Sequence, residues 1–135
     1  MILLLCDGEA VGPSRFLYDP YDFRETELFV ASACLLGRVS GSRGYGDMAR
    51  SFNSTLALRG CRRVTSALWE VDDEVGRVFA EGYMAAILNH AFGEQRDGHS
   101  YARAYVDALR NIRKHGEGEF EHEYLWAPYS YYGLG

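Results

Sequence analysis

Three residues in this chain of 135 have types and positions that could do chemistry: Cys34, Asp72 and Asp73. Cys34 follows the apolar run over residues 28–33, which predicts a buried strand, and a loop rich in Gly and Ser comes after it. In open α/β sheets, ligands and catalytic groups gather at the carboxyl ends of the strands. A thiol there could act as a nucleophile if a base, usually histidine, raised its thiolate fraction. The competing interpretation is a small buried core residue, which on composition alone is the commoner use of a free cysteine.

Asp72 and Asp73 lie in the stretch LWEVDD, directly after a strand predicted over residues 62–69. Parallel strands end at the same edge of a sheet, so we expect both carboxylates at the edge to which Cys34 belongs. One interpretation is an acidic pocket for a basic substrate side chain. The other is that both carboxylates cap the helix that follows, and the residues alone favour this second interpretation.

These residues must be positioned by strands that are largely apolar. Strands are predicted over residues 2–6, 28–33 and 62–69, with residues 9–26 as a loop. The aromatic segment EYLWAPYSYYG, residues 123–133, closes the chain as a strand-like piece. Its proline cannot donate to a ladder, which suits the edge of a sheet.

Helical spacing separates these strands. One helix is expected from Asp47 to a stop at Gly60, one opens at Asp72 and Asp73, and one ends at Gly116. Their apolar stripes are Met48, Phe52 and Leu56, then Val75, Val78, Phe79, Met84 and Ile87, then Tyr101, Ala104, Tyr105, Ala108 and Ile112. Buried strands alternating with helices predict an α/β fold with a mostly parallel sheet, and the length fits a single domain over residues 1–135.

Composition excludes several classes of function. The net charge is −5, and the one basic cluster, Arg59 with Arg62 and Arg63, is expected to flank a strand, so we expect no nucleic-acid partner. No apolar stretch is long enough for a membrane span, so we expect no membrane partner. The three cysteines have no CxxC spacing, which predicts neither a disulfide framework nor a metal site, and no cofactor is expected. Free thiols favour a cytoplasmic location.

Four segments, taken in order, resemble the carboxyl-terminal portion of the CHAT domain, a caspase-like cysteine peptidase module related to caspases and separase. MILLLCDG is similar to the strand and turn before the nucleophile strand, and YDFRETELFVASACLLG to the strand that carries the "SAC" nucleophile. GYGDMARSFNSTLALRGCRRVTSALWEVDD resembles the family's helix, its next strand and its LWxVxD motif, and EYLWAPYSYYG resembles the closing strand.

The resemblance implies a caspase-like layered sandwich in which the thiolate of Cys34 attacks a peptide carbonyl of a protein substrate. It also implies that Asp73 lines an S1 pocket that selects Arg or Lys before the scissile bond. A carboxylate facing a guanidinium gives a charge-assisted pair, which accounts for such selectivity. Asp72 is the competing candidate, and spacing does not separate the two.

This sequence departs from the family at the catalytic base, a His followed by Gly. The preferred alignment puts that segment upstream of Met1, and a second alignment puts Asp7 at the base position. The histidines, all after the third strand, match neither alignment and are expected in surface or capping roles; they are His90, His99, His115 and His122. We therefore expect the family's first strands and its His-Gly segment to be missing, and the base to come from upstream residues or from a partner chain.

A second function fits the same residues. A caspase-like domain without its base could be catalytically inactive and act as a regulatory or protein–protein interaction module. The aromatic tail could anchor a partner, although core packing is the competing use; its residues are Tyr124, Trp126, Tyr129, Tyr131 and Tyr132.

Overall fold

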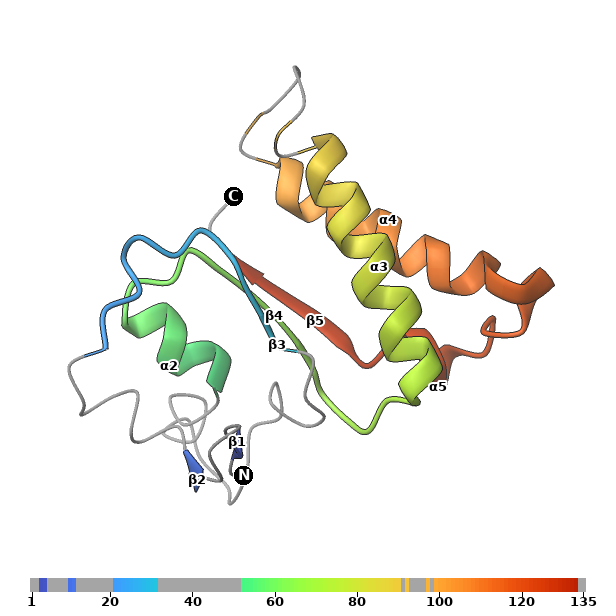
Figure 1. Ribbon diagram of the computed structural model, residues 1–135, viewed down its shortest axis with the longest axis horizontal. Coiled ribbons are helices and arrows are strands. Elements are labelled where there is room, and N and C mark those ends of the chain that lie inside the picture. The colour runs from blue at the N-terminus through green and yellow to red at the C-terminus, as the bar shows by residue number, and fades with distance from the viewer. Residues whose placement is uncertain are drawn as a thin grey trace. The chain divides into compact units, whose positions relative to one another are not determined.

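Two compact units make up the chain, and Figure 1 shows their helices and strands. The computed structural model describes residues 3–4, 10–11, 21–31, 52–90, 92, 97 and 99–133. The first unit comprises residues 1–70 and 130–134, and the second comprises residues 71–129 with Gly135. Cys34, the Gly-rich loop after it and the predicted helix start at Asp47 lie outside the described residues.

The first unit is built on a mixed sheet, which confirms the α/β class. Its strands are β3 (Phe29–Ala31), β4 (Arg63–Ala67) and β5 (Tyr129–Gly133), in the order β3-β4-β5. β3 and β4 are parallel, and β5, at an edge of this sheet as predicted, runs in the opposite direction (Figure 1). A separate antiparallel pair joins β1 (Leu3–Leu4) to β2 (Ala10–Val11).

Apolar packing holds helix α2 (Phe52–Leu58) against β4. Leu56 and Val64 are fully buried and form a cluster with Cys61, against which Phe23 and Phe29 pack. The basic residues around β4 are paired as expected for a strand flank. Glu27 accepts hydrogen bonds from Arg62 at 2.6 Å and from Arg63 at 2.8 Å.

Gly60 ends α2, as the sequence predicts. Its φ of +99° is left-handed, and the N–H groups of Gly60 and Cys61 donate to the carbonyls of Ala57 and Leu56, both at 3.0 Å. This is the Schellman arrangement, which satisfies the last carbonyls of a helix. It turns the chain directly into β4.

The second unit is a pair of helices that lie side by side, α3 (Asp73–His90) and α4 (Ser100–Lys114) (Figure 1). The 3-10 turn η2 (His115–Gly118) and the short helix α5 (Glu123–Trp126) follow. Aromatic rings fill the core: Phe79 stacks on Tyr129 with ring centroids 3.7 Å apart. The half-buried side chain of Tyr105 donates its hydroxyl to the carbonyl of Tyr129 at 2.7 Å, and burial raises the pKa of Tyr105 to about 12.

Three local expectations were wrong. β2 lies within residues 9–26, predicted as a loop, because a strand of two residues has no periodic pattern to detect. The aromatic segment begins with helix α5 rather than a strand, and β5 starts only at Tyr129. Met84 was assigned to the buried stripe of α3 but is exposed, whereas Tyr83 is fully buried. At about 100° per residue, Met84 lies about 180° around the helix from Val75, on the opposite face.

No helix within the described ranges has both the length and the apolar character to cross a membrane.

Replacing Gly60 with Ala should destabilise the chain, because an added Cβ would lie 2.5 Å from Cγ and 3.0 Å from Cα of Arg24, at a left-handed φ. We expect the free energy of unfolding, measured in urea, to fall by more than about 1 kcal/mol. Gly76→Ala is the matched control, because Gly76 is helical and the nearest atom to an added Cβ is the Tyr129 hydroxyl at 3.9 Å. It should be neutral or stabilise by roughly 0.5–1 kcal/mol. Equal losses in the two variants would contradict the role given to Gly60.

Candidate active site

The parallel pairing of β3 with β4 defines the sheet edge at which the predicted nucleophile was expected. Phe29 pairs with Val64 and Ala31 pairs with Ser66, so both strands end at the same edge. Cys34 follows Ala31 by three residues but lies outside the described residues, so its role as the nucleophile stays a prediction.

Cys61 is a second thiol of the first unit, and its surroundings are those of a structural residue. It is 5% exposed, and its Sγ donates a hydrogen bond to the carbonyl of Arg63 at 3.2 Å. Burial raises the pKa of the Cys61 thiol. Because the thiolate is the reactive form, a thiol held in this way is inert.

Asp72 caps helix α3. Its Oδ1 accepts a hydrogen bond from the N–H of Glu74 at 2.9 Å, and its carbonyl accepts one from the N–H of Gly76 at 2.8 Å. The side chain thereby satisfies one of the free N–H groups at the start of the helix. The capping interpretation is therefore confirmed for this residue.

Asp73, the first residue of α3, differs from its neighbour. Its side chain is exposed, and within the part of the chain that the structure describes its carboxylate makes no hydrogen bond or ion pair. A negative charge there is stabilised by the positive end of the helix dipole. Of the two adjacent carboxylates, Asp73 is thus the one that is open to a cationic ligand.

The histidines of the second unit are held by local interactions. Nε2 of His90 lies 2.8 Å from Oδ2 of Asp107, which joins the end of α3 to α4. Nδ1 of His122 accepts the N–H of Tyr124 at 3.2 Å and so caps α5, as predicted. The ring of His115 stacks on a phenylalanine, with 5.4 Å between centroids and 7° between planes.

The His90–Asp107 pair was not foreseen from the sequence. Asp107 also accepts a hydrogen bond from Arg110 at 3.1 Å, and the bond from His90 is the main cause that holds the pKa of Asp107 below its ordinary value. A carboxylate–imidazole pair can orient a base for catalysis. No cysteine or serine nucleophile is among the described interactions of this pair, so here the pair serves to join two helices.

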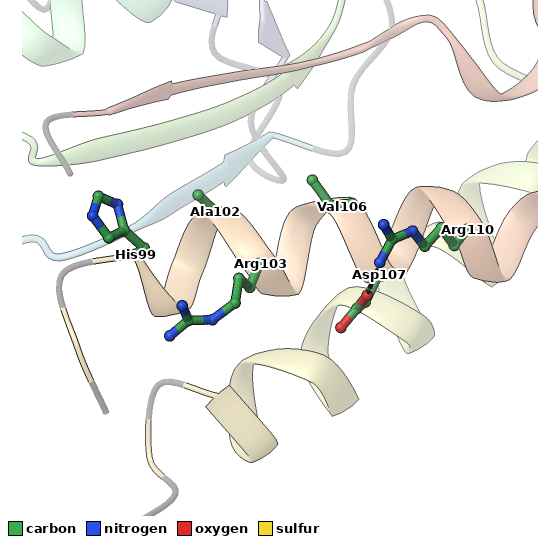
Figure 2. A pocket seen from close by; sticks show the side chains of 6 residues that line it. All are labelled: His99, Ala102, Arg103, Val106, Asp107 and Arg110. Atoms are coloured by element: carbon green, nitrogen blue, oxygen red, sulfur yellow. Dashed lines mark hydrogen bonds and ion pairs between the residues drawn. The ribbon is translucent and has the colours of Figure 1, made fainter. Parts of the chain in front are cut away.

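A pocket of about 450 Å³ lies along one face of α4 (Figure 2). Its lining residues recur at helical spacing on that face and just before the helix: His99, Ala102, Arg103, Val106, Asp107 and Arg110. The guanidinium of Arg103 donates to Asp97 at 2.5 Å and holds the pKa of Asp97 at about 2. The residues that line this pocket carry no thiol or hydroxyl group, so it does not compete with the sheet edge as the place for a cysteine or serine nucleophile.

Metal chemistry has no visible site in the described part of the chain, where no three His, Cys, Asp or Glu side chains lie close enough together to hold an ion.

Comparison with known proteins gave one match. The family model described as the CHAT domain matches residues 13–134, a range that includes Cys34, Asp72 and Asp73. No curated protein and no solved structure matches the chain.

Replacing Asp72 with Ala should lower the free energy of unfolding by about 1 kcal/mol, because the N–H of Glu74 loses its acceptor. Asp73→Ala is the control; it removes only a dipole interaction and should cost about 0.3–0.5 kcal/mol. Both variants can be compared by urea denaturation followed by circular dichroism. A larger loss for Asp73 than for Asp72 would contradict the capping assignment.

Asp107→Asn should destabilise the second unit in a pH-dependent way. The folded-state pKa of Asp107 is lowered, so its contribution is present above the unfolded pKa and is lost as the pH falls through the folded value. We expect wild type and Asp107→Asn to differ above the ordinary carboxyl pKa of about 3.9 and to converge as the pH falls below that value and through the lowered folded pKa. Thermal unfolding across this range measures the difference. A difference that grew as the pH fell would contradict the assignment.

Proposed function

Because the chain belongs to the CHAT domain family, which is related to the caspase-like peptidases, we propose that it is the nucleophile-bearing part of a cysteine endopeptidase. It cleaves protein substrates after a basic residue, with the catalytic base supplied from outside this chain. The observation that carries the proposal is the family match across Cys34 and the LWEVDD motif. The same match supports a caspase-like layering of the sheet and helices and a single domain over these residues.

Cys34 carries the covalent step in this proposal. Its thiolate attacks the carbonyl carbon of the scissile bond, the base protonates the leaving amine, and water then hydrolyses the thioester. The parallel ladder supports this role, because Cys34 follows Ala31, the last residue of β3, by three residues in the sequence.

The base is assigned to a histidine of a His-Gly segment outside these 135 residues. None of the four histidines present occupies the family's position for the base. The glycine of that segment would also contribute a backbone N–H to the oxyanion hole. Loss of one oxyanion donor alone typically costs about 10²–10³ in rate, so the isolated chain should be nearly inactive.

Asp73 is the S1 residue in this proposal, with Asp72 in a supporting role. The Asp72 carboxylate is engaged as the cap of α3, whereas Asp73 is exposed and accepts no described hydrogen bond. An arginine or lysine of the substrate would form a charge-assisted pair with the open carboxylate. Guanidinium binds better than ammonium where the pair is bidentate.

An inactive interaction module is the second candidate, and exposed apolar side chains favour it. Met84, Leu88 and Phe92 follow one another at spacings of four residues on and just after α3, and each is more than half exposed, at 55%, 62% and 68%. Exposed apolar patches mark interaction surfaces. The aromatic tail supports this function only in part, because Tyr129 is buried whereas Tyr124 and Tyr132 are exposed. For either function, three cysteines without CxxC spacing favour a cytoplasmic protein.

Labelling with a peptide electrophile that ends in arginine tests the peptidase proposal. We expect slow labelling of the 135-residue chain and fast labelling of a longer chain that carries the residues encoded upstream of Met1. Mass spectrometry of the digested protein should place the label on Cys34. Cys34→Ala should abolish labelling, and Cys61→Ala, the matched thiol control, should retain it, because the Cys61 thiol is buried.

Asp73→Asn should slow labelling by the arginine probe about tenfold or more, since a hydrogen bond between charged groups is lost. A probe that ends in norleucine should be unaffected. Asp72→Asn is the control, because Asn caps helices as well as Asp does. If the longer chain is not labelled, or if its Cys34→Ala variant is still labelled, the peptidase is ruled out and the interaction module remains. Equal effects of the two Asn substitutions would contradict the choice of Asp73.

A further inference from the structure

The pocket along α4 carries a row of alternating charges. Arg103, Asp107 and Arg110 are separated by four and then three residues, spacings that place side chains on one face of a helix. All three line the pocket, and Figure 2 shows them along the helix. Their side chains are 46%, 42% and 66% exposed, so this face of α4 presents a positive, a negative and a positive charge in that order.

Helix α3 carries the opposite row of charges. Glu74, Arg77 and Glu81 are separated by three and then four residues, and their side chains are 50%, 50% and 65% exposed. Hydrogen bonds hold this row in place, because Arg77 donates through Nε to Glu74 at 3.0 Å and through Nη1 to Glu81 at 2.8 Å. This face of α3 therefore presents a negative, a positive and a negative charge.

The two rows are complementary in charge and in spacing when the helices that carry them run in opposite directions. At 1.5 Å per residue, each row spans about 10.5 Å. The opposed residues are then Arg103 with Glu81, Asp107 with Arg77, and Arg110 with Glu74. In the parallel direction the two central charges would be out of step by one residue, so only the antiparallel direction matches every spacing.

Within one chain the two rows do not meet. α3 and α4 run in roughly opposite directions (Figure 1), and a Cβ added to Gly82 would lie 2.8 Å from Nδ2 of Asn111, so these two residues are nearly level. Glu81 comes one residue before Gly82, and Arg103 comes eight residues before Asn111. Glu81 and Arg103 of one chain are therefore about 13 Å apart along the helices.

The two arginines of the pocket have hydrogen-bond donors to spare. Arg103 donates through one nitrogen to Asp97 at 2.5 Å, and Arg110 donates through one nitrogen to Asp107 at 3.1 Å. A guanidinium carries five N–H donors, and the interactions found for these two side chains in the described part of the chain use one nitrogen each. Each arginine can therefore bind a further carboxylate.

Apolar side chains lie beside both rows. Val106, which is 41% exposed, and Ala102 line the pocket on α4. On α3, Met84 follows Glu81 by three residues and is 55% exposed. In the antiparallel match Met84 is level with the first turn of α4, next to Ala102. The same contact that opposes the charges would thus remove apolar surface from water.

We propose that the pocket face of α4 binds the charged face of α3 of a second copy of this chain, in the antiparallel direction. Exposed ion pairs add little affinity but disfavour wrong registers, so the charges set the register and the apolar contact supplies binding. Two different faces meet, so each copy offers one face of each kind and two or more copies can assemble. The proposal concerns the second unit alone and rests on neither candidate function.

Sedimentation velocity of the 135-residue chain over a range of concentrations is the first test. Wild type should associate as the concentration rises to about 1 mM, because small interfaces are weak. Raising the salt concentration from about 0.05 M to about 0.5 M should weaken the association at least about threefold, since exposed charges are screened. A chain that stays monomeric throughout would overturn the proposal, whatever other protein this face binds.

Two charge-reversed variants test which faces meet. Arg103→Glu with Arg110→Glu reverses the row on α4, and Glu74→Lys with Glu81→Lys reverses the row on α3. Each double variant alone should associate at least about tenfold more weakly than wild type, because like charges are then opposed. An equimolar mixture of the two should recover association, since the unaltered α3 of the first variant meets the unaltered α4 of the second.

Glu121→Lys with Glu123→Lys is the matched control. It changes the net charge as much as the α3 variant does, but both residues are exposed and lie outside the two rows, so association should equal that of wild type. A control that associates as weakly as the α3 variant would overturn the proposal, because net charge alone would then account for the loss. Double variants that associate like wild type, or a mixture that stays monomeric, would overturn it too.

Circular dichroism shows whether each variant is folded. If a reversed variant does not fold, the milder changes Arg103→Gln with Arg110→Gln and Glu74→Gln with Glu81→Gln take its place. Each should weaken association by a smaller factor than the reversal, and their mixture should recover it. Association equal to that of wild type in both would overturn the proposal. None of these measurements involves Cys34, so their outcome is separate from that of the peptidase proposal.

Discussion

β4 is buried along its whole length, and a strand of this kind needs a partner at each edge and cover on its faces. The edges are taken by β3 and β5, and α2 packs against the strand. Even Arg63, the first residue of β4, is 8% exposed, and its charge is matched by the carboxylate of Glu27 at 2.8 Å. The left-handed turn at Gly60 ends α2 shortly before β4, so the helix lies next to the strand that it covers.

The sequence predicted best the elements that contain a long run or a helical stripe of apolar residues. β4, α3 and α4 each carry an apolar run or stripe, and each lies near its expected bounds. β3 also lies within its expected range, but only Ala31 of this strand is buried and Val30 is 38% exposed, so β3 is less buried than predicted. Where the pattern is short, it fails. α5 has four residues and is capped by a histidine ring, so neither its length nor its cap resembles the usual helix start. Met84 was assigned to the buried stripe because its side chain is apolar. Its position around the helix axis, and not its residue type, places it on the exposed face, whereas its neighbour Tyr83 is buried.

For the candidate site, the sequence allowed predictions only about residues that lie in short sequence patterns. Cys34 and Asp73 were singled out because each follows a predicted strand, and a resemblance that the family match supports gave them their roles, which stay predictions. Contacts between distant residues carry no such signal. His90 and Asp107 lie 17 residues apart, and Ser66 and Ser130 lie 64 apart, so contacts such as these emerge only once the chain is folded. The identity of Asp72 as a cap was accessible, because an aspartate before a helical stripe predicts one.

The adjacent carboxylates at the start of α3 illustrate why two acids are more useful there than one. The amino end of a helix carries roughly half a positive charge and several free N–H groups, which would oppose the binding of a substrate cation to a single aspartate. Asp72 accepts one of those N–H groups, and the next carboxylate along, Glu74, is paired with Arg77 at 2.5 Å. Asp72 thus compensates part of the positive helix end, and the charge of Glu74 is neutralised by its arginine. Asp73 makes no described hydrogen bond or ion pair, so its charge stays available to a ligand. If Asp73 were the cap of α3 instead of Asp72, the motif would have the same composition, but the Asp73 carboxylate would be engaged by a backbone N–H. Which of the two acids caps the helix therefore decides whether this end of α3 can attract a basic side chain, and the number of acids does not.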